Sequence, residues 1–584
     1  MGDLTVRKTV RNKPRIENVL PLTALQEGLV FHAAYDEQSP DVYNVQLGID
    51  LDGALDAEAL RLAAEALLQR HGNLRISVRR RAQGDSVQVV QSHVPLPWTF
   101  AEVAGEAEAD EIALEDRSRR FDLAAAPLLR FTLLRLGAER HRFLFTTHHL
   151  LLDGWSMPLV MQELFTLYGS RGDARVLPPP VPYENYFRWL AAQDDDAAKE
   201  AWRAALSGLE EPTRMAPQAD SHRSVTPRHR VVRLSRELTE ALTRQARGHG
   251  LTLSTAVQTT WGLLLARLTG REDVVFGTTV AGRPPEVPGI ESMVGLFINT
   301  VPVRVRLEPS EPLLGLAARL QREQAELAPH QHLGMADIQR LTDVGGELFD
   351  TLTVFENYPL DADGLSEAHG LRVAGLHSHN DVHYPLALMI LPGDELTLDF
   401  GYRPDLFTEP DVDLLVQRCV RLFTAFAEAT PQLLTHDVTV LTPEERHRAL
   451  EGWNDTARPV PAAGVAELFE AQAKRSPGST AVVFEDEEIS YAELNEKADA
   501  LAHTLRARGI GPEGIVALAV PRSVEMVTSM LAVLKTGAAY LPIDPDYPSD
   551  RVAYMLADAR PQLLITTEAT RHLTEAEDTE CLLV

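Results

Sequence analysis

The sequence predicts an α/β protein made of two lobes, followed by a further α/β unit near its C-terminal end. Three observations support this prediction. Strand-like runs alternate with one-sided apolar helical patterns on both sides of a proline-rich spacer at residues 177–182. A second break spans residues 453–464, and beyond it lies a continuous apolar strand of the kind found in parallel sheets. The length of 584 residues allows about three or four domain-sized units.

The elements can be assigned in chain order. Apolar and β-branched runs indicate strands at 142–147, 273–277 and 300–305. Apolar residues spaced for one helix face indicate helices at 57–68, 183–190, 197–206 and 313–320. The spacer at 177–182 is stiff because four of its six residues are proline, so it should separate the two lobes. Beyond the second break we expect a helix at 465–474, a strand at 480–484, a helix at 491–508 and a buried strand at 514–520.

Composition excludes several classes of protein. The chain has 84 acidic and 56 basic residues, a net charge of −28, which argues against general binding to nucleic acid or anionic membranes. Its two cysteines, Cys419 and Cys581, cannot build a disulfide framework, and no cluster has zinc-finger spacing. No apolar run is long enough to cross a membrane. Residues 1–15 are basic and without apolar periodicity, so we expect a linker or arm rather than a signal peptide. A cytoplasmic enzyme, or part of one, is expected.

The stretch 147–156 contains the most informative side chains. His148 and His149 follow the strand predicted at 142–147, and Asp153 and Gly154 lie in the turn before a helix. Because adjacent residues in an extended segment point to opposite faces, one histidine should face the core and the other an open cleft. Ser156 is expected to be the N-cap of the helix that follows.

Three interpretations of this stretch compete. The two histidines can be ordinary side chains, one satisfied in the core and one exposed. They can bind a metal, but adjacent strand residues diverge, so this interpretation is the weakest. They can take part in acid–base catalysis, with an imidazole near neutral pKa and helix-terminal N–H groups available to an oxyanion.

Residues His148-His149-x-x-x-Asp153-Gly154 resemble the signature of condensation domains of nonribosomal peptide synthetases, relatives of chloramphenicol acetyltransferase. Further segments resemble the motifs of that family and occur in its order: 21–28, 70–75, 183–186, 277–283, 294–300 and 330–332. The resemblance covers about residues 16–446. It implies two chloramphenicol-acetyltransferase-like lobes, at 16–177 and 178–446, that form a V with a central tunnel, followed by a linker at 447–462.

The remaining residues, 463–584, resemble the beginning of an adenylation domain. Residues 489–494 and 534–544 resemble its first two motifs, whereas the Ser/Thr/Gly-rich phosphate loop that should come next is not among these residues. We therefore expect no adenylation activity from this chain. We also expect this partial unit to be marginally stable and open to proteolysis, because its parallel strands should lack neighbours and cover on their apolar faces.

The resemblance implies an acyltransferase reaction between two carrier proteins, one upstream and one downstream, in antibiotic or siderophore biosynthesis. Each carrier presents a 4'-phosphopantetheine thioester, and the acceptor's α-amine attacks the donor's thioester carbonyl. No cofactor or metal bound by the chain itself is implied. His149 is expected in the cleft as a general base or hydrogen-bond partner, and His148 is expected to be the inward, structural histidine.

The turn residues have separate expected roles. A buried carboxylate at Asp153 requires a cationic partner, for which the sequence offers Arg283 and Arg75. We favour Arg283, since an arginine from the second lobe would also fix the relation of the lobes. Gly154 should permit close backbone approach to the thioester.

Finer resemblances favour the subtype that accepts a D-configured donor residue, which implies an epimerisation domain upstream. They lie at 73–75, 152–158, 332–334 and 383–386. Two alternatives share the fold. An epimerisation domain would need an added acid, for which Glu356 in Phe355-Glu356-Asn357-Tyr358 is the candidate. A non-catalytic recruitment module would bind carriers or tailoring enzymes, although such modules usually lose the histidine motif.

Overall fold

The computed structural model describes residues 15–35, 41–82, 84–219, 223, 225–356, 370–574 and 579–584. Contacts divide the chain into two compact units, Met1–Ala449 and Leu450–Val584. The arm expected at 1–15 lies outside the described residues except for Arg15. Within the described ranges, no helix is both long and apolar enough to cross a membrane.

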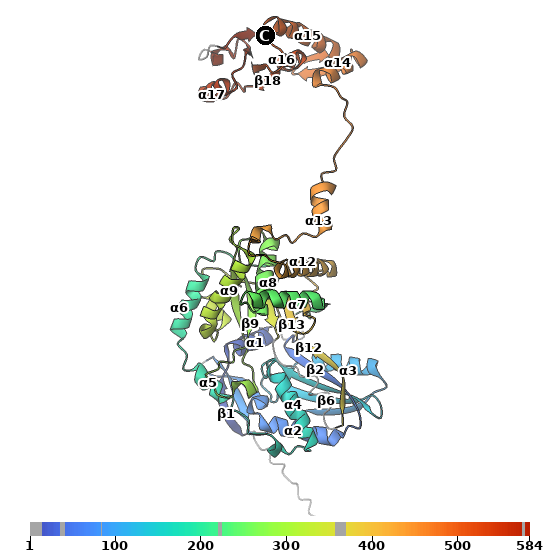
Figure 1. The fold of residues 1–584 in the computed structure, drawn as a ribbon, viewed down its shortest axis with the longest axis vertical. Coiled ribbons are helices and arrows are strands. Elements are labelled where there is room, and N and C mark those ends of the chain that lie inside the picture. The colour runs from blue at the N-terminus through green and yellow to red at the C-terminus, as the bar shows by residue number, and fades with distance from the viewer. Residues whose placement is uncertain are drawn as a thin grey trace, which may run out of the picture. The chain divides into compact units, whose positions relative to one another are not determined.

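The first unit contains a sheet with strand order β12-β2-β7-β6-β5, which we call the first sheet (Figure 1). Its strands are β2 (Asn44–Asp52), β5 (Trp98–Glu102), β6 (Leu129–Arg135), β7 (Arg140–His148) and β12 (Arg372–His379). Alternate side chains of β7 pack on opposite faces. Phe143 and Phe145 join the core under α2 (Ala57–Arg70) and α4 (Ser156–Gly169), while Leu144 packs with Ala109 of α3 (Glu106–Ser118). Both faces of the sheet are therefore covered.

A smaller sheet and one helix complete the first lobe. The small sheet has strand order β1-β4-β3, with β1 (Ile16–Pro21), β3 (Ile76–Arg80) and β4 (Ser86–Gln91), and α1 (Ala24–Tyr35) follows β1. Arg70 and His71, at the end of α2, both contact the Glu163 carboxylate on α4, at 3.0 and 2.6 Å. This shared carboxylate fastens the two core helices to each other.

The second sheet has strand order β10-β9-β11-β13-β14-β8. Its strands are β8 (Arg228–Arg233), β9 (Asp273–Val280), β10 (Asn299–Arg306), β11 (Thr351–Phe355), β13 (Leu386–Leu391) and β14 (Thr397–Tyr402). The helices that follow the spacer are α5 (Glu184–Leu190), α6 (Asp195–Leu206), α7 (Arg236–Gly248), α8 (Leu253–Thr269), α9 (Leu313–Leu327), α10 (Met335–Gln339), α12 (Glu409–Ala427) and α13 (Pro443–His447). Trp261 of α8 is fully buried in the core of this lobe, with Phe276 and Phe400 of the sheet.

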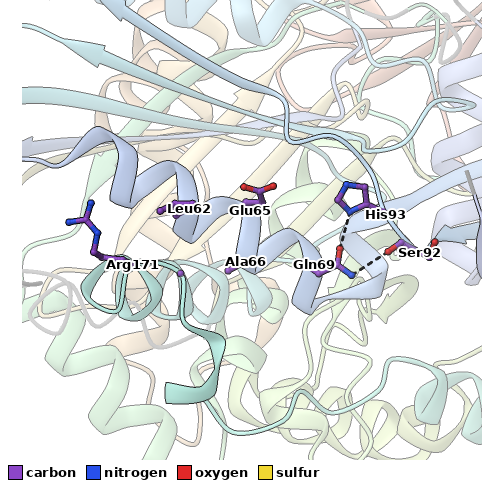
Figure 2. A pocket seen from close by; sticks show the side chains of 8 residues that line it. Leu62, Glu65, Ala66, Gln69, Ser92, His93 and Arg171 are labelled. Atoms are coloured by element: carbon purple, nitrogen blue, oxygen red, sulfur yellow. Dashed lines mark hydrogen bonds between the residues drawn. The ribbon is translucent and has the colours of Figure 1, made fainter. Parts of the chain in front are cut away.

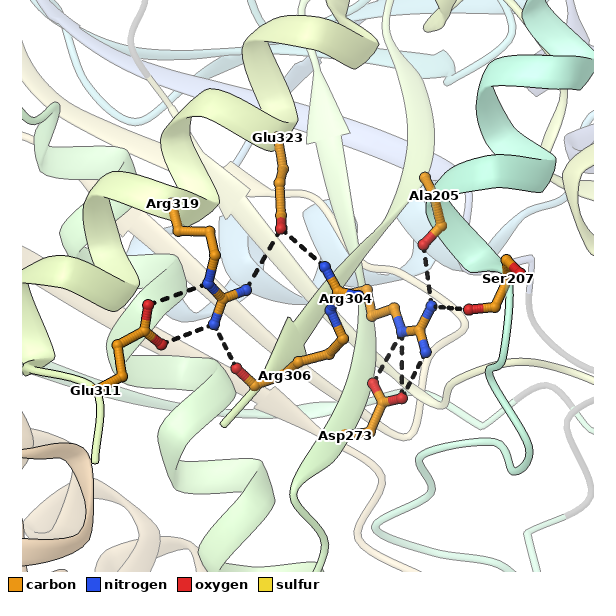
Figure 3. Close-up of polar contacts among 8 residues, drawn as sticks. All are labelled: Ala205, Ser207, Asp273, Arg304, Arg306, Glu311, Arg319 and Glu323. Carbon is orange, nitrogen blue, oxygen red and sulfur yellow. Dashed lines mark hydrogen bonds and ion pairs between the residues drawn. The ribbon is translucent and has the colours of Figure 1, made fainter. Parts of the chain in front are cut away.

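Charged side chains close the outer edge of the second sheet (Figure 3). Arg304 on β10 binds Asp273 on β9 through two nitrogens and also donates to the carbonyls of Ala205 and Ser207 at the end of α6. Next to it, Arg306 on β10 pairs with Glu323 on α9 at 3.0 Å, and Arg319 of the same helix donates to the Arg306 carbonyl. The edge strand β10 is thereby tied to α6 and α9.

The predicted boundary at 177/178 does not separate the two sheets. Strand β12 lies far beyond residue 178, yet it pairs with β2 of the first sheet from Arg372↔Asp52 to His379↔Gln46. The second lobe therefore sends a strand into the first lobe and takes the chain back at β13. Backbone pairing over such a sequence separation leaves no local signal. The strands and helices of this unit that were predicted from local patterns correspond to β7, β9, β10, α2, α5, α6 and α9.

The second unit contains a parallel sheet with strand order β18-β17-β19-β20. Its strands are β17 (Ile515–Ala519), β18 (Ala539–Pro542), β19 (Leu563–Thr566) and β20 (Cys581–Leu583), and a separate hairpin pairs β15 (Thr480–Phe484) with β16 (Glu487–Ser490). The helices are α14 (Val465–Arg475), α15 (Tyr491–Ala507), α16 (Val524–Thr536) and α17 (Ser549–Ala559).

The lack of cover expected for the parallel strands is not found at β17, whereas the marginal stability of this unit stays a prediction. Val516 and Leu518 of β17 pack with residues of α15 and α16, while Ala517 and Ala519 pack on the opposite face with α17. Lys535 adds a polar tie, because its buried ammonium group contacts Glu470 and Asp499 at 2.6 and 2.7 Å. The sheet thus has helices on both faces.

The break between the units should be the first site of proteolysis. All residues from 451 to 464 are exposed, and 457–463 belong to no helix or strand. Limited digestion is expected to cut first between Glu451 and Gly464, because a protease needs an extended, unpaired backbone. Peptide mapping by mass spectrometry would locate the first cut. An earlier cut within residues 15–450 or 465–584 would contradict this prediction.

Candidate active site

The two predicted histidines lie at the end of β7, on opposite sides of the backbone. His148 is the last residue of the strand and is opposite Asn44 in the ladder with β2. His149 continues the pairing by one step, since its N–H donates to the carbonyl of Tyr43 at 2.9 Å. His148 is fully buried and His149 is partly exposed, whereas a cleft in front of His149 stays a prediction.

His148 is held by groups on both sides of its ring. Its Nδ1 accepts the N–H of Leu150 at 3.1 Å, so the ring proton lies on Nε2. Nε2 is 3.3 Å from Oδ2 of Asp41, a buried carboxylate that also accepts the N–H of Tyr43. Burial alone would raise the pKa of Asp41, but His148, the Tyr43 N–H and Arg120 outweigh it and keep the pKa below its usual value. His148 thus lies against a buried carboxylate whose pKa is lowered, and its structural role stays a prediction.

His149 has the electrostatics of a neutral imidazole. Burial lowers its pKa below the usual value of a histidine, and the neighbouring His148 acts in the same direction. The carbonyls of His149 and Leu152 and the charge of Asp153 oppose this shift without reversing it. Nδ1 of His149 is buried, while the residue as a whole remains partly exposed. The ring can accept a proton or a hydrogen bond at neutral pH.

Asp153 is buried, and both of its carboxylate oxygens accept hydrogen bonds. Its Oδ1 accepts from the Ser156 N–H at 2.8 Å and from Arg283 at 3.0 Å, and its Oδ2 accepts from the Phe297 N–H at 3.0 Å. The side chain of Asp153 is 0% exposed and that of Arg283 is 5% exposed. The ion pair favoured from the sequence is present, and a carboxylate with these partners is suited to positioning rather than to proton transfer.

Arg283 belongs to a loop of the second lobe, residues 281–298, that folds over the histidine turn. Its Nη1 donates to the carbonyls of Ile290 and Met293, and its Nη2 donates to Ser156 Oγ as well as to Asp153. The guanidinium carbon lies 4.1 Å from the centre of the Phe297 ring. At Gly282, φ is 59° and a Cβ would lie 1.8 Å from the Phe297 carbonyl oxygen, so only glycine lets the loop fold back.

Residues from separate predicted motifs meet around the same turn. Gln26 donates to the carbonyl of Leu150 at 2.8 Å, and Asn73 donates to the carbonyl of Leu151 at 3.3 Å. Tyr183 donates to the carbonyl of Leu296 in the 281–298 loop. Arg75, the alternative partner for Asp153, instead contacts Glu17 and backbone carbonyls of the first lobe. These motifs build the support of the histidine turn rather than its exposed face.

Two local expectations need correction or extension. Ser156 is not the N-cap of α4, because Trp155 before it is already helical, with φ −68° and ψ −35°. Asp153 accepts the free N–H of Ser156 in its place, and Ser156 Oγ bonds Gly295 at both its carbonyl and its N–H. Gly154 does not have a positive φ, so its backbone conformation does not require glycine. Close approach of its backbone to a substrate stays a prediction.

Sequence reasoning missed Asp41 and Tyr43, which lie directly before β2. The only signal for them was an acid and an aromatic residue next to a strand start. Glu356 directly follows β11, and its N–H donates to the Ile390 carbonyl of β13. Asn357 and Tyr358 lie outside the described residues. No acid role of Glu356 follows from this contact.

The structure gives no group of three or more His, Cys, Asp or Glu side chains in the described ranges arranged to hold a metal ion. A surface pocket of the first lobe lies between α2 and the turn after α4, where Glu65, Gln69, His93 and Arg171 line it (Figure 2). None of the predicted site residues lines this pocket. The tunnel between the lobes remains a prediction.

Comparisons with known proteins agree on the nature of both units. The sequence matches the family described as Condensation domain over residues 16–450, and the family described as AMP-binding enzyme over residues 469–583. Bacitracin synthase 3 of Bacillus licheniformis is 36% identical over 94% of this chain, and tyrocidine synthase 2 of Brevibacillus parabrevis is 33% identical over 96%. The chain spans only 9% and 16% of those two proteins.

Solved structures show the same fold at low sequence identity. A nonribosomal peptide synthetase, FmoA3, has a TM-score of 0.76 at 23% identity, covering 98% of this chain and 60% of its own. The first condensation domain of the calcium-dependent antibiotic synthetase, in complex with a substrate analogue, has a TM-score of 0.61 at 20% identity. That match covers 73% of this chain and 100% of the condensation domain.

Proposed function

Because the chain belongs to the condensation-domain family of nonribosomal peptide synthetases, followed by part of an AMP-binding adenylation domain, we propose that it joins two carrier-bound substrates at His149. The donor is a peptidyl or aminoacyl thioester, and the acceptor is an aminoacyl thioester with a free α-amine. Both are presented on 4'-phosphopantetheine arms of partner carrier proteins, upstream and downstream. The observation that carries this proposal is the partly exposed imidazole of His149, whose pKa is lowered by burial, beside the turn in which the Asp153 side chain is 0% exposed.

The chemistry requires little more than this arrangement. An α-ammonium group has a reference pKa of about 8, so the acceptor amine must lose a proton before or during attack. The neutral amine nitrogen forms a bond to the thioester carbon, the carbon–sulfur bond breaks, and the proton lost by the nitrogen ends on the leaving sulfur as a thiol. A neutral imidazole can take that proton from the nitrogen and return it to the sulfur, or it can hold the amine by a hydrogen bond. Since a thioester is already activated, orientation supplies much of the remaining acceleration.

Asp153 and Arg283 are proposed to act through the turn. They join the loop 281–298 of the second lobe to residues 153–156 of the first lobe, which restrains the backbone near Gly154 and His149. A rigid turn keeps His149 in line with an incoming amine, which is the condition for near-attack geometry.

The proposal can be tested with purified carriers. The chain is incubated with one carrier loaded with a donor and another loaded with an acceptor amino acid, and both are read by intact-protein mass spectrometry. Transfer of the donor acyl group to the acceptor arm supports condensation. Epimerisation without transfer, seen as uptake of solvent deuterium at the α-carbon, or no reaction at all, would favour the epimerisation domain or the recruitment module instead.

We further propose that the donor residue has the D configuration, which implies an epimerisation domain upstream. Donor carriers loaded with a D-residue should condense faster than those loaded with its L-epimer. An inverted α-carbon turns the thioester carbonyl away from the attack direction, so the difference should appear mainly in the rate of transfer. Single-turnover rates for both epimers measure it, and faster reaction of the L-donor would refute the assignment.

Residues 463–584 are proposed to form no aminoacyl adenylate on their own, because they contain no Ser/Thr/Gly-rich segment to hold the phosphates of ATP. Incubation of this chain with ATP and each amino acid should give no pyrophosphate exchange above background. Exchange with any amino acid would show that the sheet of the second unit binds ATP by other groups.

A further inference from the structure

We propose that Tyr43 is a positioning residue for His149, and that its hydroxyl contact with His383 makes this position depend on the second lobe. The inference rests on the proposed function, since it assigns a further residue to the same site. It starts from one residue that touches both the catalytic histidine's backbone and the chain returning to the second sheet.

Tyr43 is the backbone partner of His149. Its carbonyl accepts the His149 N–H at 2.9 Å, one step beyond the last paired residues of β2 and β7. Its own N–H donates to Asp41 Oδ1 at 3.1 Å, so the residue is fixed by the same carboxylate that contacts His148. The place of the His149 backbone is thus set by where Tyr43 lies.

The other end of Tyr43 reaches a different part of the molecule. Its hydroxyl oxygen lies 2.6 Å from Nδ1 of His383, and Tyr43 is only 5% exposed. Burial, together with Tyr384 and Asp41, raises the pKa of Tyr43 well above its usual value, so the hydroxyl keeps its proton. The ring of His32 on α1 lies 4.2 Å from that of His383, centre to centre, which confines the imidazole.

His383 lies in a segment, residues 380–385, that links the two sheets. The chain leaves β12 of the first sheet at His379 and enters β13 of the second sheet at Leu386. Asp381 of this segment contacts Nε2 of His229 on β8 at 2.9 Å, and Nδ1 of the same imidazole contacts Asp399 on β14 at 3.0 Å. The two carboxylates raise the pKa of His229 to about 10, so the imidazole is charged at neutral pH.

Segment 380–385 is therefore anchored on both sides. Asp381 binds it to the edge of the second sheet, and His383 binds it to Tyr43 in the first lobe. A displacement of the second lobe would reach His149 through one side chain and one backbone hydrogen bond. Since a shift of about 1 Å at a reacting group can cost about 100-fold in rate, this connection is sufficient to control the reaction.

Four variants test the inference in the two-carrier assay. Tyr43→Phe removes only the hydroxyl, and His383→Leu removes its partner. Each is expected to lower kcat for transfer by about tenfold with unchanged KM for both carriers, and the double variant should lose no more than either single one. His383→Asn should recover most of the rate, because its side-chain oxygen lies where Nδ1 was.

Tyr168→Phe is the matched control. Tyr168 is a buried tyrosine of α4 whose hydroxyl accepts the Asp56 N–H at 3.1 Å, away from the histidine turn. The Tyr168→Phe variant should keep the wild-type kcat. Its melting temperature should equal that of Tyr43→Phe within experimental error. Wild-type kcat in Tyr43→Phe, equal losses in Tyr43→Phe and Tyr168→Phe, or additive losses in the double variant would overturn the inference.

A second measurement needs no condensation activity. Diethyl pyrocarbonate modifies neutral imidazoles, and peptide mapping gives the rate at His149 alone. This rate should rise severalfold in Tyr43→Phe and His383→Leu but not in Tyr168→Phe, because only the first two release the His149 backbone. An unchanged modification rate at His149 in Tyr43→Phe and His383→Leu would refute the positioning role. Failure of the wild-type protein to transfer any acyl group would refute only the proposed function.

Discussion

Replacing His149 with alanine is expected to slow amide formation by about 100-fold or more, which is the usual contribution of a positioned general base. The residue is partly exposed, and its buried Nδ1 makes no hydrogen bond with the described residues. His149→Ala should therefore fold normally and bind both carriers. Single-turnover transfer between loaded carriers measures the loss, and circular dichroism with thermal melting checks the fold.

His148→Ala is the matched comparison at the adjacent position. His148 is fully buried against Asp41, so its removal leaves an ionised carboxylate without its imidazole and opens a cavity beside Tyr43. The melting temperature should fall by several degrees, while protein that remains folded should keep more activity than His149→Ala. The opposite ranking, with activity lost at His148 and stability lost at His149, would contradict the assignment of their faces.

Removal of the Asp153 carboxylate should give the largest loss of stability in the first unit. Asp153→Ala leaves Arg283 buried without its ionic partner and leaves the N–H groups of Ser156 and Phe297 unpaired. Breaking a buried ion pair in this way costs about 3–5 kcal/mol. Denaturant unfolding followed by fluorescence gives the free energy of unfolding directly.

Two further variants separate the charge from the shape of Asp153. Asp153→Asn should cost less than Asp153→Ala, because the amide oxygen can still accept the Ser156 N–H. Arg283→Met combined with Asp153→Ala should cost less than the sum of the single changes, since the two residues are one pair. Equal free energies of unfolding for wild type, Asp153→Ala and Asp153→Asn would exclude a stabilising ion pair.

The local features of the site could be predicted from the sequence because they depend on short-range geometry. Alternation along an extended strand places His148 and His149 on opposite faces, and a turn before a helix places Asp153 beside free N–H groups. The rule that a buried carboxylate requires a cation left Arg283 and Arg75 as candidates, and the choice of Arg283 rested on its place in the second lobe. Local rules failed at Ser156, because the helical conformation starts one residue earlier than its N-cap preference indicates.

The long-range features could not be predicted. Asp41 reaches His148 across more than a hundred residues, and Tyr43 reaches His383 across 340 residues, with no periodicity that connects them. The pairing of β12 with β2 in the first sheet is another long-range contact. A lobe boundary placed at the proline-rich spacer gives no indication of it. In the second unit, the helical cover of β17 on both faces depends on packing between α15, α16 and α17.

The most direct test of condensation at His149 follows both carrier arms in one reaction. Intact-protein mass spectrometry of donor and acceptor carriers, sampled over time, should show the donor arm losing one acyl group for each one that the acceptor arm gains. Folded His149→Ala should show neither change over the same period. Loss from the donor arm without gain on the acceptor arm, or an equal rate of transfer in His149→Ala, would contradict the account.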